Sequence, residues 1–256
     1  MRKILTFLSI MATLVLFVAC GNSKPAEGEQ KKDGGEKQVA QSADVKKNIA
    51  VVYSTGGKGD KSFNDAVFHG LEKAKAELGI KFSEYEPKNA ESEAKEALEK
   101  FAETGEYDLI IGVGYTIKDS LTAVAQSFPD QKFAIIDDEI KLPNVVSLKY
   151  KEEEGSFLVG ALAAMMDKTG TIGFVGADNS DLIAKFFAGY AQGARYVKPD
   201  IKVIPVTIGG TSAFNDQASA KAKTETLIQQ GADVVYHAAG ASGLGVFQAV
   251  KEKNIY

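Results

Sequence analysis

Few residues of this chain are of types that do chemistry, and their spacing does not form a catalytic pattern. The two histidines, His69 and His237, stand far apart, and no spacing joins either of them to a set of metal ligands. The segment from Gly240 to Gly243 carries a serine and is close to a nucleophile elbow, but its second glycine comes one residue early. The adjacent carboxylates of Asp137 and Asp138 lack a nucleophile or a metal partner for acid-base work. We therefore expect no enzyme activity, no metal and no cofactor.

The single cysteine, Cys20, follows an apolar run from Ile4 to Ala19 that comes directly after Arg2 and Lys3. A basic start, an apolar segment and a small residue before the cleavage point are typical of a secretory signal peptide. The run is shorter than the ~20 apolar residues that a membrane span needs. Because an exported protein usually pairs its thiols and this chain has no second cysteine, we predict that Cys20 carries a lipid. An ordinary secretory signal with an incidental cysteine is the alternative.

The segment from Leu16 to Cys20 resembles the lipobox of bacterial lipoproteins, with Phe17 in place of the usual leucine. The resemblance implies that residues 1–19 are a lipoprotein signal peptide and that lipidated Cys20 becomes the new N-terminus. Two acyl chains hold a protein stably on a membrane, whereas one chain binds weakly. Residues 20–47 are rich in Gly, Glu, Lys, Gln and Ser, so we predict a flexible tether. This places the protein on the extracytoplasmic face of the cell membrane.

After the tether, predicted strands and helices alternate along the chain. Continuous apolar runs such as Ile49 to Tyr53 are typical of parallel strands that are buried on both faces. The predicted strands cover residues 49–53, 81–85, 109–111, 133–136, 145–148, 172–175, 202–207 and 233–237. The predicted helices cover residues 63–78, 90–103, 118–128, 152–166, 181–196, 213–229 and 243–253. This order predicts an α/β fold with parallel sheets.

The alternation restarts near Tyr150, which predicts two α/β lobes, residues 48–147 and 148–256, with a hinge between Val146 and Tyr150. Ile255 and Tyr256 read as the start of another strand, so we expect the second lobe to be incomplete and the chain to be truncated. Small and polar residues follow the strands of both lobes, where open α/β sheets bind ligands. Many of them would also suit ordinary turns. Their recurrence in both lobes favours a cleft that is lined from two sides.

The charge balance excludes one class of partner. Thirty Lys and Arg residues stand against 34 Asp and Glu residues, for a net charge of −4. Binding to nucleic acid depends on a surplus of basic side chains that neutralise phosphates. We therefore expect no nucleic-acid partner.

Three segments of the chain resemble one family, the basic membrane protein family of lipoproteins. They are Val51–Asp65, with the core Asp-Lys-Ser-Phe-Asn; Phe133–Asp137 together with Glu154–Ala164; and Gly231–Ala249. Members of this family are substrate-binding proteins of ABC transporters and are related to purine nucleoside receptors. The resemblance spans Asn48 to Tyr256. It implies a periplasmic-binding-protein type I fold of the ribose-binding kind, whose two lobes close on a nucleoside.

The family pattern also implies the residues that contact the ligand. They are Ser54, Phe63, Asn64, Asp137, Phe214 and Gly240. The two phenylalanines would stack on the base, and such stacking contributes ~1–3 kcal/mol per contact. The carboxylate would accept hydrogen bonds from ribose hydroxyls, and the glycine would let its backbone approach the sugar. Ser54 stands where many relatives have aspartate, so a carboxylate contact becomes a hydroxyl contact.

The leading interpretation is a monomeric, membrane-anchored receptor that delivers a nucleoside, with a purine base expected, to the permease subunits of an ABC importer. A protein of the same class that binds a sugar or a signalling molecule is the first alternative. A surface adhesin or host-interaction lipoprotein is the second, and it would need no closed cleft. An enzyme such as a nucleoside hydrolase is the third, and base release in a simple assay would reveal it.

Overall fold

We describe residues 47–256 from a computed structural model of the chain. The predicted signal peptide, the lipidation site at Cys20 and the predicted tether up to residue 46 lie outside the described residues. In the described part, strands and helices alternate, and the strands form two sheets in which every neighbouring pair is parallel. The predicted α/β fold with two parallel-sheet lobes is confirmed.

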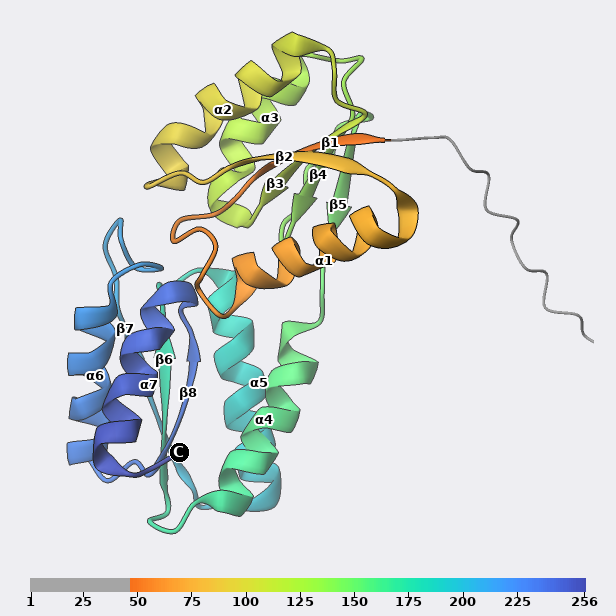
Figure 1. Cartoon of the computed structure of the whole chain (residues 1–256). Coiled ribbons are helices and arrows are strands. Elements are labelled where there is room, and N and C mark those ends of the chain that lie inside the picture. Colours follow the sequence, from red (N-terminus) through yellow and green to blue (C-terminus); the bar gives the residue numbers. More distant parts are fainter. Residues whose placement is uncertain (1–46) are drawn as a thin grey trace, which may run out of the picture. The chain divides into compact units, whose positions relative to one another are not determined.

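The first lobe is built on a five-stranded sheet of order β2-β1-β3-β4-β5. Its strands are β1 (Asn48–Val52), β2 (Lys81–Tyr85), β3 (Leu109–Val113), β4 (Phe133–Ile136) and β5 (Val145–Leu148). Its helices are α1 (Phe63–Leu78), α2 (Ala90–Thr104), the short η1 (Tyr115–Ile117) and α3 (Lys118–Ser127). In Figure 1, α1 lies on one side of this sheet and α2 and α3 lie on the other.

Strand β1, an interior strand of the sheet, shows why this lobe has a hydrophobic core on each face of the sheet. Ala50 and Val52 are buried among residues of α2 and α3, whereas Ile49 and Val51 are buried against α1. Successive side chains of a strand point to opposite faces of the sheet. Because both faces are covered by helices, each residue of the strand is apolar except the first, and the continuous apolar run follows from this geometry.

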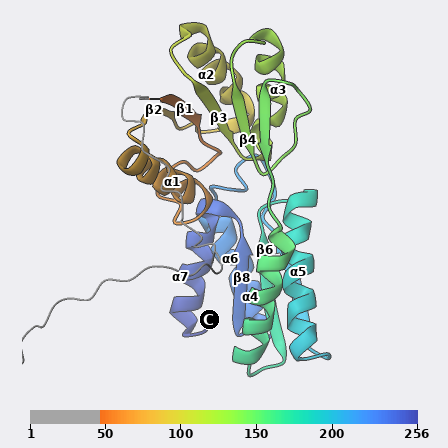
Figure 2. The same cartoon turned by 90° about the vertical axis from the view of Figure 1, so that its right-hand side faces the viewer.

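The second lobe is built on a three-stranded sheet of order β7-β6-β8. Its strands are β6 (Thr171–Gly176), β7 (Lys202–Thr207) and β8 (Val234–Ala238). Its helices are α4 (Glu152–Met166), α5 (Asp181–Val197), α6 (Gln217–Gln229), the short η2 (Gly240–Ser242) and α7 (Gly243–Lys253). Figures 1 and 2 place α4 and α5 on one side of this sheet and α6 and α7 on the other.

Helices α4 and α5 approach each other closely through glycines. A Cβ atom at Gly160 would lie 1.9 Å from the backbone oxygen of Tyr190. A Cβ atom at Gly193 would likewise lie 1.9 Å from the backbone oxygen of Phe157. Two side-chain-free surfaces let the helix backbones come nearer than ordinary side chains permit. This close packing sets the position of α5, whose first turns reach the candidate site.

The predicted elements agree with the observed ones to within two residues, apart from one helix start and one strand. Helix α6 begins at Gln217 and not at residue 213, because the Asp216 side chain accepts the backbone N–H of Ser219 and caps the helix there. Phe214 therefore lies in a turn. The strand predicted at Ile255 and Tyr256 is not formed, although Tyr256 exchanges two backbone hydrogen bonds with Asp233 and Val235 beside β8.

The two lobes meet where β5 leads into α4. Strand β5 continues to Leu148, which pairs with Ile136, so the first sheet extends one residue past the predicted boundary at residue 147. The chain then passes through Lys149 and Tyr150 to the start of α4. Both lobes present the carboxyl ends of their strands to the space between them, and the candidate site lies there.

Candidate ligand-binding cleft

A cavity of about 340 Å³ lies between the lobes, at the carboxyl ends of the strands. Volumes of this size are typical of small-molecule sites. Its wall combines the loops after β1, β3 and β4 with the first turns of α5, the turn that carries Phe214 and the end of β8. The lining residues include Ser54, Phe63, Asn64, Tyr115, Asp137, Phe186, Phe214, Tyr236, His237 and Gly240. The cavity is therefore lined from both lobes.

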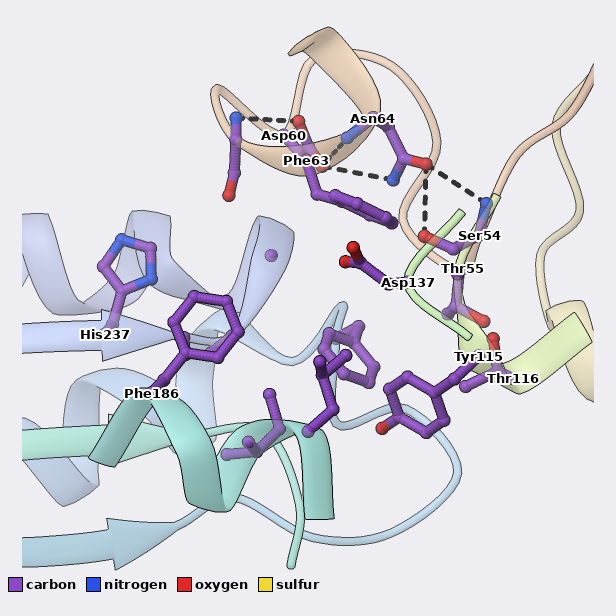
Figure 3. Close-up of a pocket in the computed structure, with 18 of the residues that line it drawn as sticks. Ser54, Thr55, Asp60, Phe63, Asn64, Tyr115, Thr116, Asp137, Phe186 and His237 are labelled. Carbon is purple, nitrogen blue, oxygen red and sulfur yellow. Dashed lines mark hydrogen bonds between the residues drawn. The ribbon is translucent and has the colours of Figure 1, made fainter. Parts of the chain in front are cut away.

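The loop between β1 and α1 holds its polar side chains in fixed positions. The side-chain oxygen of Asn64 accepts the backbone N–H and the hydroxyl of Ser54, both at 3.1 Å (Figure 3). The side-chain nitrogen of Asn64 donates to Asp60 at 3.1 Å. Among the described residues, its second N–H has no acceptor. Asn64 is buried and lines the cavity, so this N–H is available to a ligand.

Outside the cavity, the same loop makes hydrogen bonds and an ion pair to residues of β2 and of the segment just after it. The Lys58 ammonium lies 2.9 Å from one carboxylate oxygen of Glu84, and the Tyr53 hydroxyl donates to the other oxygen at 2.6 Å. The backbone N–H of Lys58 also donates to Glu86 at 2.8 Å. Burial and the neighbouring Glu84 raise the pKa of Tyr53 far above its usual value, so its hydroxyl stays a donor. These contacts limit the movement of the segment that carries Ser54 and Asn64.

Asp137 follows β4 and turns its carboxylate into the cavity (Figure 3). Its φ of 65° is a left-handed backbone conformation, and its backbone N–H donates to Leu148 at 2.8 Å. The carboxylate accepts no hydrogen bond from the described residues. Burial, and to a lesser extent the nearby Glu152, raise the pKa of Asp137 to about 6, although Lys185 opposes the shift. A partly buried carboxylate without a donor is a place where ligand hydroxyls would bind.

Aromatic rings border the cavity from both lobes. Phe63 begins α1 in the first lobe, and Phe186 lies one turn into α5 in the second (Figure 3). The ring of Phe214 stands edge-on to that of Tyr115, with centroids 6.1 Å apart. The described residues show no direct ring contact between Phe63 and Phe214. The rings thus leave room for a flat group instead of filling the site themselves.

Two side chains of β8 complete the second-lobe wall. The Tyr236 hydroxyl lies 3.4 Å from the hydroxyl of Ser156 on α4. His237 packs edge-on against Phe247, with ring centroids 5.0 Å apart, and its Nδ1 is buried without a partner among the described residues. Burial lowers the pKa of His237, so the imidazole is neutral at pH 7.

Gly240 begins η2, two residues after β8, with a φ of 51°, a conformation that glycine adopts without strain. A Cβ atom there would lie 3.4 Å from both the ring and the backbone oxygen of Phe214. Close by, the buried Ser242 hydroxyl donates to the backbone oxygen of Ala213 at 2.8 Å and accepts the backbone N–H of Asp216 at 2.7 Å. This serine therefore holds the Phe214 turn in place, and its hydroxyl is engaged on both sides.

All six residues that the family pattern assigns to ligand contacts lie on this one cavity: Ser54, Phe63, Asn64, Asp137, Phe214 and Gly240. Sequence reasoning missed Tyr115, Phe186, Tyr236 and His237 as lining residues. The sequence did contain a pattern that could have predicted Phe186. Leu182, Ile183 and Phe186 share one face of a helix that starts after a strand end. Tyr115 stands two residues after the end of β3, so its position carried the strand-end signal, but its contacts with the other lobe left none.

Two kinds of feature are absent from the described residues. Residues 47–256 contain no group of His, Cys, Asp or Glu side chains arranged to hold a metal ion. Within the same range, no helix has both the length and the apolar character to cross a membrane.

Two α/β lobes with a cavity at facing strand ends define the class of periplasmic-binding-protein type I solute-binding proteins. A solved ABC transporter solute-binding protein from Aeropyrum pernix superposes with a TM-score of 0.74 at 32% identity, over 81% of this chain and 59% of its own. The family described as ABC transporter substrate-binding protein PnrA-like matches residues 46–256. The chain belongs to this family, known as Bmp. The resemblance seen in the sequence is thereby confirmed.

Two curated relatives illustrate the family. An uncharacterized lipoprotein of Pyrococcus abyssi is 36% identical over 99% of this chain and 61% of its own length. The ABC transporter nucleoside-binding protein BmpA of Lactococcus lactis is 35% identical over 80% of this chain and 58% of its own length. The chain thus spans about three fifths of the length of these relatives.

Proposed function

We propose that this protein binds a nucleoside with a purine base and delivers it to the permease subunits of an ABC importer. The observation that carries the proposal is that aromatic rings line one interlobe cavity together with the Asp137 carboxylate, which accepts no hydrogen bond from residues 47–256. A nucleoside needs both kinds of contact, because its base is flat and apolar on its faces whereas its ribose carries hydroxyls. The relative named as nucleoside-binding supports this choice of ligand.

Each wall of the cavity has a distinct role in this proposal. The base stacks between Phe63 and Phe214, and each stacking contact contributes ~1–3 kcal/mol. Asp137 accepts ribose hydroxyls, the free N–H of Asn64 donates to the ligand, and Ser54 offers a hydroxyl. The backbone at Gly240 approaches the sugar, since no side chain intervenes. The protein binds its ligand without turning it over.

We further propose that residues 48–147 and 148–256 move as two lobes about a hinge between Val146 and Tyr150. The ligand enters the open cleft and is enclosed when the lobes close, and closure creates the surface that a permease recognises. We also propose that residues 1–19 are removed and that Cys20 anchors the monomeric protein to the outer side of the cell membrane. The relative named as a lipoprotein supports this anchor. Mass spectrometry of the membrane-extracted protein tests it, since unmodified Cys20 would rule it out.

Isothermal titration with inosine, guanosine, adenosine and ribose tests the ligand. We expect a purine nucleoside to bind in the micromolar range or tighter and ribose to bind far more weakly, because ribose lacks the stacking base. Phe63→Leu keeps an apolar side chain but removes the aromatic face, and we expect affinity to fall roughly ten-fold. Phe101→Leu, a core substitution in α2 outside the cavity, is the matched control. Ribose binding without nucleoside binding would contradict the nucleoside assignment and favour a sugar receptor.

The alternative classes give different outcomes with the same variants. Binding of a macromolecular partner that survives both Phe63→Leu and Asp137→Asn would favour a surface adhesin. Release of free base from a bound nucleoside would instead indicate a hydrolase. Neither outcome is expected, because the proposal needs both residues for binding and assigns no nucleophile.

A further inference from the structure

Tyr115 connects the two lobes across the cavity. It follows β3 of the first lobe, after Gly114, and opens the short helix η1. Its hydroxyl donates a hydrogen bond to the carboxylate of Asp178, which follows β6 of the second lobe. Its ring packs edge-on against Phe214, also in the second lobe, at an interplanar angle of 68°. One side chain therefore touches two separate loops of the opposite lobe.

Asp178, which accepts the Tyr115 hydroxyl, is fixed in orientation by hydrogen bonds within its own lobe. The other carboxylate oxygen of Asp178 accepts the backbone N–H of Ser180 at 2.9 Å. The neighbouring Asn179 accepts the Thr207 hydroxyl at 2.9 Å, which joins this loop to β7. Ser180 in turn caps α5 by accepting the backbone N–H of Ile183 at 3.4 Å. The carboxylate thus faces Tyr115 in an orientation set by its own lobe.

The hydroxyl of Tyr115 is a permanent donor at ordinary pH. Burial and the nearby Asp178 carboxylate both raise the pKa of Tyr115 well above its usual value. A hydrogen bond from a neutral donor to a carboxylate is stronger than one between neutral groups. This bond exists only when the lobes are close, because its two ends belong to different lobes.

The turn that Tyr115 touches is also approached by the loop after β1. A Cβ atom at Gly56 would lie 3.3 Å from both the Phe214 backbone oxygen and the Ala241 Cβ. The Phe214 turn is thus contacted by two first-lobe loops, one at its backbone and one at its ring. Of these two first-lobe contacts, only that of Tyr115 is with the ring, which packs in its own lobe against the cluster of Ala177, Ala213 and Ala239.

We propose that Tyr115 is a positioning residue that couples lobe closure to the orientation of the Phe214 ring. The hydrogen bond to Asp178 holds the lobes closed, and the edge of the Tyr115 ring then fixes the face that Phe214 presents to the ligand. This role deepens the proposed function and depends on it for the identity of the ligand. The coupling itself does not depend on which ligand is bound.

The first experiment measures binding kinetics with inosine by stopped flow. Tyr115→Phe keeps the ring contact and removes the hydrogen bond, so we expect the dissociation rate to rise roughly ten-fold while the association rate changes little. Asp178 does not line the cavity, so Asp178→Asn tests the same bond from the side that touches no ligand. We expect Asp178→Asn to raise the dissociation rate in the same direction, and the double variant to add little to either change.

The matched control is Tyr85→Phe, which removes a tyrosine–carboxylate hydrogen bond of 3.2 Å to Glu93 inside the first lobe. It should leave both rate constants unchanged. A thermal melt of each ligand-free variant separates coupling from simple loss of structure, since positioning predicts little change in the midpoint. Equal dissociation rates in the unaltered protein, Tyr115→Phe and Asp178→Asn would overturn the inference.

A second experiment needs no nucleoside. Spin labels at Lys95→Cys in α2 and Gln229→Cys in α6, in a chain with Cys20→Ser, report the distance between the lobes by pulsed electron spin resonance. We expect Tyr115→Phe and Asp178→Asn to shift the distribution to longer distances, and Tyr85→Phe to leave it unchanged. Identical distributions in all four proteins would overturn the coupling. If the unaltered protein binds no nucleoside, the proposed function fails while this measurement still decides the inference.

Discussion

The side-chain nitrogen of Asn64 donates a hydrogen bond to the Asp60 carboxylate at 3.1 Å, and the same oxygen accepts the Asn64 backbone N–H at 2.9 Å. The other oxygen of Asp60 accepts the backbone N–H groups of Ser62 and Asp65. One buried carboxylate therefore caps the start of α1 and orients a side chain of the candidate site. Ser62, which stands at the cap position, makes no side-chain capping bond, so Asp60 takes its place.

Replacing this carboxylate should weaken the fold and the site together. We expect Asp60→Ala to lower the free energy of unfolding by about 2 kcal/mol, because several buried N–H groups lose their acceptor. Urea denaturation measures the change. Asp130→Ala, at an exposed position in the turn before β4, is the control and should change the free energy by less than about 0.5 kcal/mol. An equal effect of the two substitutions would contradict the capping role.

Ligand affinity should depend on pH through Asp137. The pKa of this carboxyl is raised to about 6, and the ionised form is the stronger acceptor because both of its oxygens share the negative charge. We therefore expect the dissociation constant for a nucleoside to rise roughly ten-fold between pH 7 and pH 5, as the ionised fraction falls. Titration calorimetry across this range measures the dependence. Asp137→Asn should bind more weakly at pH 7 and lose the dependence, whereas an unchanged pH profile in this variant would assign the effect to another group.

Lowering the pH weakens ligand binding through Asp137, but through the same residue it should increase the free energy of unfolding of the ligand-free protein. The folded-state pKa of Asp137 is about 6, above the ordinary value of 3.8, so the folded state binds its proton more tightly than the unfolded state. Stability contributed by this group is present at low pH and is lost as pH rises from about 4 to 6. Asp137→Asn removes the cost of the ionised carboxylate. We expect the variant to be more stable at pH 7 by about 1 kcal/mol, after allowance for solvent screening, and equally stable near pH 3.5.

Denaturant titrations at the two pH values measure this difference. A variant that is less stable than the unaltered protein at pH 7 would contradict the prediction. Weaker binding together with higher stability would identify Asp137 as a residue kept for the ligand and not for the fold.

The close contact of α4 and α5 can be tested with two glycines. Gly193→Ala places a methyl group 1.9 Å from the Phe157 backbone oxygen, and we expect a loss of about 3 kcal/mol or more in the free energy of unfolding. Gly155→Ala on α4 has open space around its Cβ, and we expect a gain of up to about 1 kcal/mol from helix propensity. Chemical denaturation of both variants measures the contrast. Similar stabilities would show that the helices separate without cost.

The sequence alone determined the elements and the edge of each sheet at which the site would form. Apolar runs such as Ile49 to Val52 are long enough to require cover on both faces, and this requirement leads to parallel strands between helices. Because carboxyl ends of parallel strands share one edge, the residues that follow the strands had to gather there. For this reason Ser54, Phe63, Asn64 and Asp137 lie together in the first lobe, and Phe214 and Gly240 lie together in the second. Local patterns carry this information because they repeat with the period of a strand or a helix.

The tertiary structure alone decided how the two lobes face each other. Tyr115 and Asp178 are separated by 63 positions, and their contact depends on closure of the lobes, which leaves no periodic signal in either segment. The turn that carries Phe214 reads as helix in the sequence, but Asp216 and the distant Ser242 hold it outside α6. The raised pKa of Asp137 likewise follows from burial between lobes and from Glu152, since a carboxylate's environment is made by neighbours that the chain brings from elsewhere.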